Sequence, residues 1–253
     1  MSEGAAGGYD PALHAQLAPL EAESFWFQAR NKLVVAALRR HFPAAGSLLE
    51  VGCGNGVVLE AIAAAAPHLR LGGVDLFEAA LETARRRVPT AELIQADLRS
   101  LSFKADWDVV GAFDVLEHIE EDGAVLGQIR RALRPGGGLI ALVPQHRWLW
   151  SEADVVARHV RRYTRRELRA KLHAAGFAPL VTTSFVSLPL PLLIAARLRS
   201  RIAPRTYDPR REILPGPVLN TALARVLDLE RALLLAGVRL PAGGSLLVVA
   251  RAF

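Results

Sequence analysis

Short apolar runs alternate with longer segments in which apolar residues recur at helical spacing along most of the chain. Such runs are typical of buried strands, and the longer segments between them are typical of amphipathic helices. Strands are predicted over residues 47–51, 69–75, 92–95, 107–113, 139–143 and 245–250. Helices are predicted up to residue 41 and over residues 57–66, 78–87, 121–133, 164–175 and 218–236. This alternation predicts a single α/β domain over residues 1–253, with a mostly parallel sheet covered on both faces.

One strand-to-helix turn is rich in glycine. Residues 52–56 read Gly-Cys-Gly-Asn-Gly, directly after the first predicted strand. Glycine lets the backbone approach a ligand closely, and the start of a helix presents free N–H groups. The turn therefore predicts a cofactor-binding loop. Asp75, at the end of the next strand, is placed to bind ribose hydroxyls, with a helix cap as its alternative role.

Composition narrows the classes of partner. Lys and Arg number 31 against 25 Asp and Glu, which gives a net charge of +6. This charge suits an acidic partner, but the arginines are spread over several predicted helices, which favours a role as general surface cations. We therefore expect no nucleic-acid partner. The single cysteine excludes an internal disulfide, and no Cys/His cluster has metal-ligand spacing, so the sequence predicts no metal site.

The sequence also bears on location. The first residues lack the basic stretch and apolar run of a signal peptide, and the chain has no apolar run long enough to span a bilayer. We expect a cytoplasmic protein.

The glycine turn opens a series of motifs that resembles the class I S-adenosylmethionine-dependent methyltransferases. Glu50-x-Gly52-x-Gly54-x-Gly56 is similar to the first motif of that family, and Asp75 to its ribose-binding acid. Further motifs at residues 95–98, 113–119 and 133–138 follow in the family's order. The resemblance implies a three-layer, doubly wound Rossmann-like fold with a seven-stranded sheet whose last strand is antiparallel. It implies S-adenosylmethionine as the cofactor and methyl transfer as the reaction.

The resemblance also assigns residues to the cofactor. Asp97 would accept a hydrogen bond from the adenine amino group, the Leu98 backbone would contact the ring, and Glu50 would hold the glycine turn. The implied cofactor-binding residues are Arg30, Glu50, Gly52, Cys53, Gly54, Asn55, Gly56, Asp75, Leu76, Asp97, Leu98, Phe113 and Asp114.

Two further segments resemble a bacterial subgroup of small-molecule methyltransferases. Residues 25–31 are similar to its leading helix, which implies that residues 1–45 form a helical lid and that Arg30 pairs with the cofactor carboxylate. An amphipathic helix with core aromatics is the alternative. Residues 159–164 are similar to its Gly-His-x-Arg-Arg-Tyr-Thr run, with Arg158 in place of the glycine. The implied acceptor-binding residues are Trp26, His146, Trp148 and Tyr163.

If the acceptor is a hydroxyl, catalysis needs a side chain that can accept its proton. A hydroxyl acceptor must lose its proton, and a neutral imidazole titrates near physiological pH, so His118 and His159 are the candidate bases. We expect an O-methyltransferase that acts on a small hydrophobic molecule, with nitrogen and carbon acceptors as alternatives on the same motifs.

Three other functional classes fit the sequence less well. Val57 stands where a nicotinamide-dependent oxidoreductase has the third glycine of its fingerprint, which argues against that class. The intact glycine turn with Asp75 and Asp97 argues against a non-catalytic assembly subunit. The third class is the nucleic-acid methyltransferases. The chain lacks the Asn/Asp-Pro-Pro-Tyr/Phe motif of base-flipping enzymes after the fourth strand, which argues against that class.

Residues 187–241 break the alternation and are interpreted as a helical insertion before the last strand. Its first part is apolar and contains Pro189 and Pro191, and six arginines follow within residues 197–211. Prolines disfavour a continuous surface helix, so we interpret the insertion as a cap over the acceptor site. The alternative is an interfacial segment that contacts a membrane peripherally and serves a lipid-like substrate. A monomer and a homodimer fit equally well.

Overall fold

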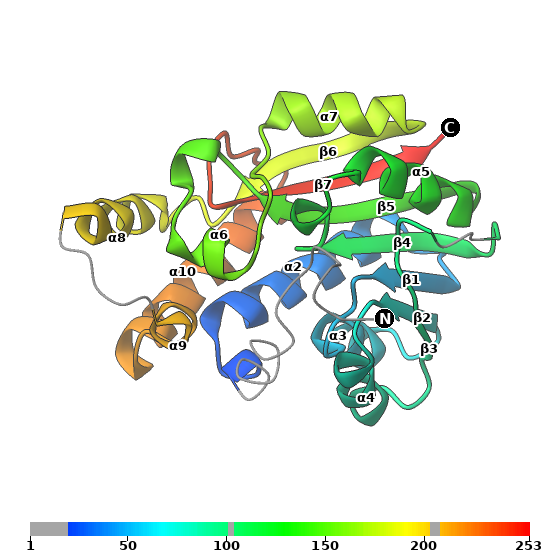
Figure 1. The fold of residues 1–253 in the computed structure, drawn as a ribbon, viewed down its shortest axis with the longest axis horizontal. Helices are drawn as coiled ribbons and strands as arrows, with labels where there is room; N and C mark the ends of the chain where they lie inside the picture. Colours follow the sequence, from blue (N-terminus) through cyan, green and yellow to red (C-terminus); the bar gives the residue numbers. More distant parts are fainter. Residues whose placement is uncertain (1–19, 101–103, 203–207) are drawn as a thin grey trace.

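The computed structural model describes residues 20–100, 104–202 and 208–253. Its seven strands form one sheet in the order β3-β2-β1-β4-β5-β7-β6 (Figure 1). Strand β7 pairs antiparallel with β5 and β6, and the pairs from β3 to β5 are parallel, as predicted. The strands are β1 (Ser47–Val51), β2 (Arg70–Asp75), β3 (Glu92–Gln95), β4 (Trp107–Phe113), β5 (Leu133–Pro144), β6 (Phe177–Phe185) and β7 (Ser245–Ala252).

Helices cover both faces of the sheet, which gives three layers. Buried side chains of α2, α3, α4 and α10 form one core with the sheet, and those of α5 and α7 form the other (Figure 1). The α-helices are α2 (Phe25–His41), α3 (Val57–Ala65), α4 (Glu78–Arg87), α5 (Asp122–Ala132), α6 (Glu152–Val156), α7 (Arg165–Ala174), α8 (Leu190–Ile202), α9 (Pro209–Ile213) and α10 (Pro217–Leu235). Two short 3-10 helices are η1 (Leu116–His118) and η2 (Arg147–Leu149).

The structure corrects the prediction for the start of the insertion. Helix α8 runs without interruption from Leu190 to Ile202, although two prolines were expected to prevent this. Pro189 precedes the helix and Pro191 lies in its first turn. A backbone N–H in the first turn has no intrahelical partner, so proline removes no hydrogen bond there. The structure therefore contains a continuous helix whose first part is apolar and whose second part carries arginines.

The insertion is fastened to the rest of the domain. Asn220 of α10 accepts a hydrogen bond from the Phe25 N–H (2.9 Å) and donates one to the Glu23 carbonyl (2.9 Å), which caps the start of α2. The buried carboxylate of Glu230 accepts the backbone N–H groups of Ser187 and Leu188 at 2.9–3.0 Å. These contacts hold the start of α2 and the segment before α8 against α10.

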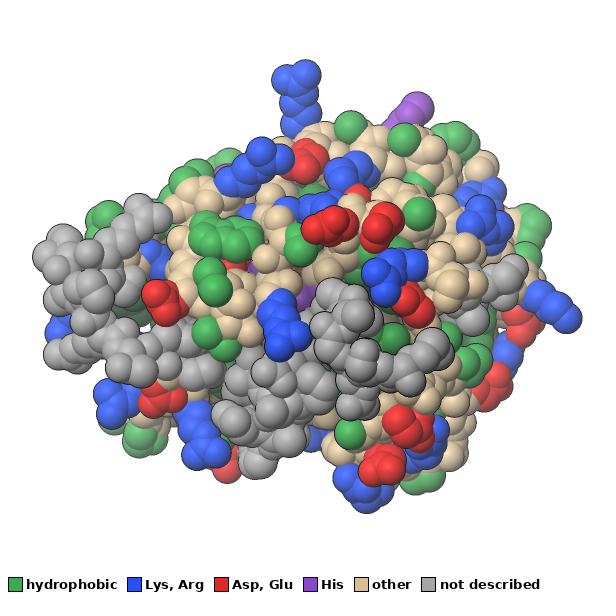
Figure 2. Space-filling model, in the orientation of Figure 1, with side chains coloured by type: hydrophobic (Ala, Val, Ile, Leu, Met, Phe, Trp, Pro, Cys, Tyr) green, Lys and Arg blue, Asp and Glu red, His purple; other side chains and the backbone are tan. Residues whose placement is uncertain are grey.

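The described surface mixes charges of both signs. In Figure 2, basic and acidic side chains lie interspersed over the visible face. This distribution fits the interpretation of the arginines as general surface cations. None of the described helices has the length and apolar character needed to cross a bilayer.

Strained backbone gathers at the carboxyl ends of the strands. Asp114 follows β4, His146 follows β5 and Val186 follows β6, and each has a positive φ (52°, 63° and 59°). For side chains other than glycine this conformation costs roughly 1–2 kcal/mol. Such strain persists where surrounding structure over-determines it, commonly at functional sites. The strand order also reverses between β1 and β4 at this end, where open α/β sheets bind ligands.

Candidate functional site

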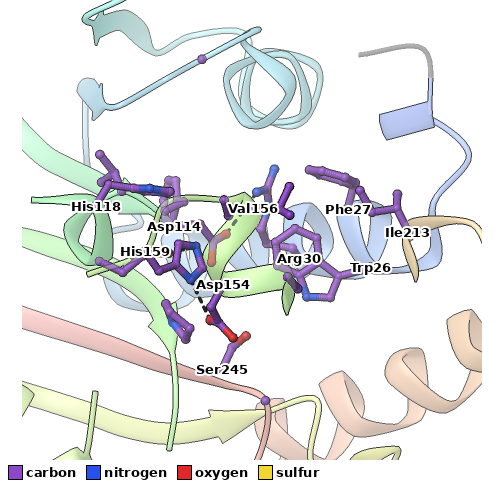
Figure 3. A pocket seen from close by; sticks show the side chains of 18 of the residues that line it. Trp26, Phe27, Arg30, Asp114, His118, Asp154, Val156, His159, Ile213 and Ser245 are labelled. Atoms are coloured by element: carbon purple, nitrogen blue, oxygen red, sulfur yellow. Dashed lines mark hydrogen bonds and ion pairs between the residues drawn. The ribbon is translucent and has the colours of Figure 1, made fainter. Parts of the chain in front are cut away.

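A cavity of about 1730 Å³ opens at the carboxyl ends of the strands (Figure 3). It is bounded by the glycine turn, the start of α2, the segments after β4 and β5, and helices α8 to α10. Most of the predicted site residues therefore share one space. Those that line it are Trp26, Arg30, Glu50, Gly52, Cys53, Gly54, Asn55, Asp75, Leu76, Asp97, Leu98, Phe113, Asp114, His118 and His159.

The glycine turn has a conformation that other residues would strain. Gly52, Gly54 and Gly56 have φ values of 70°, 50° and 78°. A Cβ atom on Gly52 would lie 2.3 Å from Cγ2 of Val115, and one on Gly56 would lie 2.9 Å from Cβ of Ala84. Gly56 itself does not line the cavity but lets α4 approach the turn. The turn thus presents bare backbone to the cavity, which fits the close approach of a cofactor.

Asp75 connects the end of β2 to this turn. Its side chain lines the cavity although the residue is only 7% exposed. One carboxylate oxygen accepts the N–H of Gly54 (2.8 Å) and the other accepts the N–H of Phe77 (3.0 Å). A carboxylate has about four acceptor positions, so both oxygens retain capacity for ribose hydroxyls. Asp75 therefore shapes the turn and faces the predicted ribose position.

The region assigned to adenine holds a residue that the sequence analysis missed. Asp97 lines the cavity and pairs with Arg99, whose Nη2 lies 2.6 Å from its carboxylate. This pairing lowers the pKa of Asp97. An ionised carboxylate only accepts hydrogen bonds, as contact with an amino group requires. The only sequence signal for this ion pair is that Arg99 lies two residues after Asp97.

Arg30 lies between the start of α2 and β4. Its guanidinium is 3.2 Å from the carboxylate of Asp114 and lies over the rings of Trp26 (4.9 Å) and Phe27 (4.8 Å) (Figure 3). Burial raises the pKa of Asp114, and the arginine opposes that rise. The structure thus pairs Arg30 with a carboxylate of the chain itself, at the edge of the cavity where the cofactor carboxylate is expected.

The segment before α2 contacts the glycine turn directly. Glu21 accepts hydrogen bonds from Asn55 (3.3 Å) and Arg87 (3.1 Å), and burial raises its pKa. Sequence analysis assigned no role to Glu21 or Arg87. Part of the predicted lid, residues 1–19, lies outside the described residues.

Two histidines from distant segments meet on the acceptor side of the cavity. Figure 3 shows the side chains of His118 and His159 near each other. Their ring centroids are 4.8 Å apart, with 76° between the ring planes. Nδ1 of His159 is 2.8 Å from Asp154. Burial raises the pKa of Asp154, but hydrogen bonds from His159 and Arg162 outweigh this and lower it to about 2. An ionised Asp154 requires the proton on Nδ1, so Nε2 is the bare nitrogen of the neutral His159 ring.

Residues 158–164 hold His159 in this position. Arg158 adopts φ 54°, the left-handed conformation suited to the glycine that the subgroup has at this position. The Val160 N–H donates to the Glu117 carbonyl (2.8 Å), which joins this segment to η1. Arg161 pairs with Asp122 (2.7 Å), and Arg162 pairs with Asp154 (2.7 Å). The contacts of residues 158–164 therefore mainly fix the position of His159.

The structure does not bring three of the predicted acceptor-binding residues to the cavity. His146 stacks on Trp148, with ring centroids 5.1 Å apart, and Trp148 is 52% exposed. Tyr163 is fully buried, and its hydroxyl donates to Asp122 (2.7 Å), with the Leu116 carbonyl as a more distant acceptor (3.2 Å). The three residues were predicted to bind the acceptor because they follow the end of β5. The backbone of Gln145 pairs with that of Tyr163, and their side chains do not line the cavity. Trp26 does line the cavity.

Tyr163→Phe should therefore act on stability. It removes the hydroxyl that binds Asp122, while Lys171 and Arg161 still neutralise that carboxylate. We expect the free energy of unfolding to fall by about 1–2 kcal/mol in urea titrations, with turnover of the folded variant unchanged. Loss of turnover at unchanged stability would return Tyr163 to the acceptor site.

A further grouping was not predicted from sequence. Glu117, His118 and His159 each offer a metal-ligating atom, and these atoms all lie within 4.8 Å of one another. Spacing along the chain indicated no metal-ligand cluster, and the structure brings these three side chains together from separate segments. Two ligands are adjacent in η1 and the third comes from a distant segment, so spacing along the chain did not reveal them.

Comparison with known proteins agrees with this geometry. A family model described as a methyltransferase domain matches residues 22–182. A Mycolicibacterium smegmatis protein named a probable S-adenosylmethionine-dependent methyltransferase is 32% identical over 161 residues, which cover 62% of this chain and 61% of that protein. The ubiquinone biosynthesis O-methyltransferase of Thiobacillus denitrificans is 33% identical over 102 residues, which cover 38% of this chain and 43% of the relative. The chain thus spans less than two thirds of the length of either relative.

Solved structures show the same fold. A chain in the complex of the Haloferax volcanii Trm112 methyltransferase activator with a methyltransferase aligns with a TM-score of 0.62 at 19% identity. The alignment covers 95% of this chain and 94% of the other. At this identity the likeness establishes the fold alone.

Proposed function

Because this chain belongs to the class I S-adenosylmethionine-dependent methyltransferases, we propose that it is an enzyme that methylates an oxygen atom of a small hydrophobic molecule. The observation that carries the proposal is that one cavity contains both the glycine turn with Asp75 and the pair His118 and His159. Cofactor and acceptor would meet between these two groups.

The residues on the cofactor side would bind and orient. Bound S-adenosylmethionine supplies an electrophilic methyl group on a sulfonium, so the protein contributes mainly position and exclusion of water. Asp75 would accept the ribose hydroxyls, Asp97 the adenine amino group, and Arg30 would pair with the cofactor carboxylate. Exchange of Asp114 for that carboxylate would keep the guanidinium charge balanced at the edge of the cavity.

The residues on the acceptor side would remove a proton. Nε2 of His159 is the bare nitrogen, and Asp154 stabilises the ring when it becomes cationic, as in other His–carboxylate pairs. His118 is adjacent and is the second candidate base. An oxygen acceptor needs such a group because a hydroxyl is a weak nucleophile until its proton leaves. The name of the Thiobacillus relative, an O-methyltransferase, also supports oxygen as the acceptor.

The insertion supports a hydrophobic acceptor. The part of the cavity wall that comes from the insertion and the segment before it is largely apolar, and its members include Val186, Pro189, Leu192, Leu193, Leu219 and Leu223. Apolar walls bind ligands by removing apolar surface from water. This lining supports the interpretation of residues 187–241 as a cap over the acceptor.

Other expectations stay predictions. Nitrogen and carbon acceptors are compatible with the same cofactor site. The alternative without catalysis is an assembly subunit. The cytoplasmic location, contact with a membrane, and the choice between monomer and homodimer rest on the sequence alone.

The proposal is tested by product formation. Purified protein is incubated with S-adenosylmethionine and a panel of phenols, hydroxylated quinols, aliphatic alcohols and matched amines, and S-adenosylhomocysteine is quantified. We expect turnover with at least one apolar hydroxyl compound and none with its methyl ether. Turnover confined to amines would contradict oxygen as the acceptor, and none with any compound despite cofactor binding would favour the assembly subunit.

A further inference from the structure

Three side chains at the acceptor side of the cavity have the chemistry of a metal site. Glu117 and His118 come from η1, and His159 comes from the segment between α6 and α7. One ligating atom of each lies within 4.8 Å of those of the other two, and all three residues line the cavity. Zinc binds nitrogen and oxygen ligands at about 2.0–2.2 Å, so modest side-chain rotation brings the three atoms around one ion.

The carboxyl group of Glu117 is only partly compensated for its burial, by a backbone hydrogen bond and by the charge of Arg162. The side chain is 1% exposed, and among the described residues no group donates a hydrogen bond to its Oε2. Its Oε1 lies 3.9 Å from Nε2 of His159, beyond hydrogen-bonding distance. Burial of an incompletely paired carboxylate is unfavourable, and a coordinated cation would offset that cost. The cavity therefore presents an unpartnered ligand oxygen beside two imidazoles.

His159 is already arranged as a ligand would be. Its Nδ1 is bound to Asp154 at 2.8 Å, which leaves Nε2 directed toward Glu117. A carboxylate behind a ligating histidine fixes the ring and raises its basicity in many metal sites. Asp154 is in turn held by Arg162 (2.7 Å), and the Val160–Glu117 backbone hydrogen bond joins the two segments that supply the ligands.

We infer that Glu117, His118 and His159 bind one divalent transition-metal ion, and that this ion binds the acceptor hydroxyl. Two imidazoles and one carboxylate match zinc best, and three protein ligands leave a coordination position for an oxygen of the substrate. The inference rests on the proposed function and replaces its base: with the ion present, both histidines are ligands.

The ion would change how the proton leaves. A hydroxyl bound to a divalent cation ionises at a lower pH than a free one, so it loses its proton to water on coordination. The resulting oxygen anion forms the new O–CH₃ bond. The S–CH₃ bond breaks with its electron pair passing to sulfur, which leaves neutral S-adenosylhomocysteine. The acceptor class is accordingly a hydroxyl compound that can coordinate metal, such as a phenol.

The test uses Co²⁺ as a spectroscopic probe. Protein stripped with EDTA is titrated with Co²⁺, visible absorption is followed, and Zn²⁺ is added in competition. We expect one ion per chain, displaced by Zn²⁺. Glu117→Ala, His118→Ala and His159→Ala should each weaken Co²⁺ binding by about 100-fold or more, and Asp154→Asn by about 10–100-fold. His68→Ala, which removes an exposed histidine outside the cavity, should bind as the wild type does.

S-adenosylhomocysteine binding is measured on each variant to show that it is folded. Absence of Co²⁺ and Zn²⁺ binding in wild type that binds S-adenosylhomocysteine would overturn the metal site and leave the proposed function standing. Equal binding by wild type and the three alanine variants would also overturn it. Full methyl transfer by the stripped protein, with no further increase when Zn²⁺ is added, would overturn the role of the ion and restore His159 as the base. Metal binding without any cofactor binding would instead contradict the proposed function.

Discussion

Asp75→Ala should weaken binding of S-adenosylhomocysteine by about 100-fold or more. The substitution removes acceptors for two ribose hydroxyls, and each hydrogen bond to a charged group contributes roughly 1.5–3 kcal/mol. It also removes the oxygen that binds the Gly54 N–H at 2.8 Å, so the glycine turn loses its tie to β2. Both effects act on the cofactor side of the cavity. Calorimetric titration of wild type and variant measures the difference directly.

Two variants separate these effects. Asp75→Asn keeps one acceptor oxygen and should lose less affinity than the alanine variant. Asp228→Ala removes a partly exposed carboxylate that pairs with Lys32 (3.0 Å) outside the cavity, and should bind S-adenosylhomocysteine with wild-type affinity. Wild-type affinity in folded Asp75→Ala would show that the cofactor does not contact this residue.

His159→Asn should abolish most turnover while leaving the cofactor bound. His159 acts on the acceptor oxygen either directly, as the proton acceptor, or through the ion that it ligates. A positioned proton acceptor contributes about 10²–10⁴-fold to the rate. His159 comes from the segment between α6 and α7 and is not part of the glycine turn, so affinity for S-adenosylhomocysteine should stay within about two-fold of wild type. The turnover number at saturating acceptor and the dissociation constant of S-adenosylhomocysteine are the two measurements.

A matched change elsewhere controls for the loss of a histidine. His173→Asn alters an exposed residue on α7 and should leave turnover unchanged. Asp154→Asn tests position alone, because it removes the charge behind the ring and keeps His159. It should lower turnover less than His159→Asn does. Full turnover in His159→Asn would transfer the role to His118.

The cofactor loop and every strand except β6 (Phe177–Phe185) were predicted by residue range, because local sequence determines them. Strands β3 and β4 and helix α4 have the predicted limits, since each apolar run ends at a clear turn or charged residue. The glycine turn was predictable for the same reason, because positive φ at Gly52 and Gly54 leaves its mark on the sequence. Predictions of this kind need only residues that are neighbours along the chain.

The acceptor side was harder because it depends on contacts between distant segments. Tyr163 lies after η2 and α6 in sequence, yet its backbone pairs with Gln145 at the end of β5 and its hydroxyl reaches the Leu116 carbonyl of η1. Glu117 and His159 are neighbours only because the Val160 N–H binds the Glu117 carbonyl. Neither arrangement has a local signature. The apolar part of α8 was misjudged for a different reason, since the prolines fall before the helix and in its first turn.

The most direct test of the whole account is calorimetric titration of wild-type protein with S-adenosylhomocysteine, with NADH titrated in parallel. The account predicts one binding site per chain for S-adenosylhomocysteine, with a dissociation constant in the micromolar range, and no heat of binding for NADH. Absence of S-adenosylhomocysteine binding, or comparable binding of NADH, would contradict it.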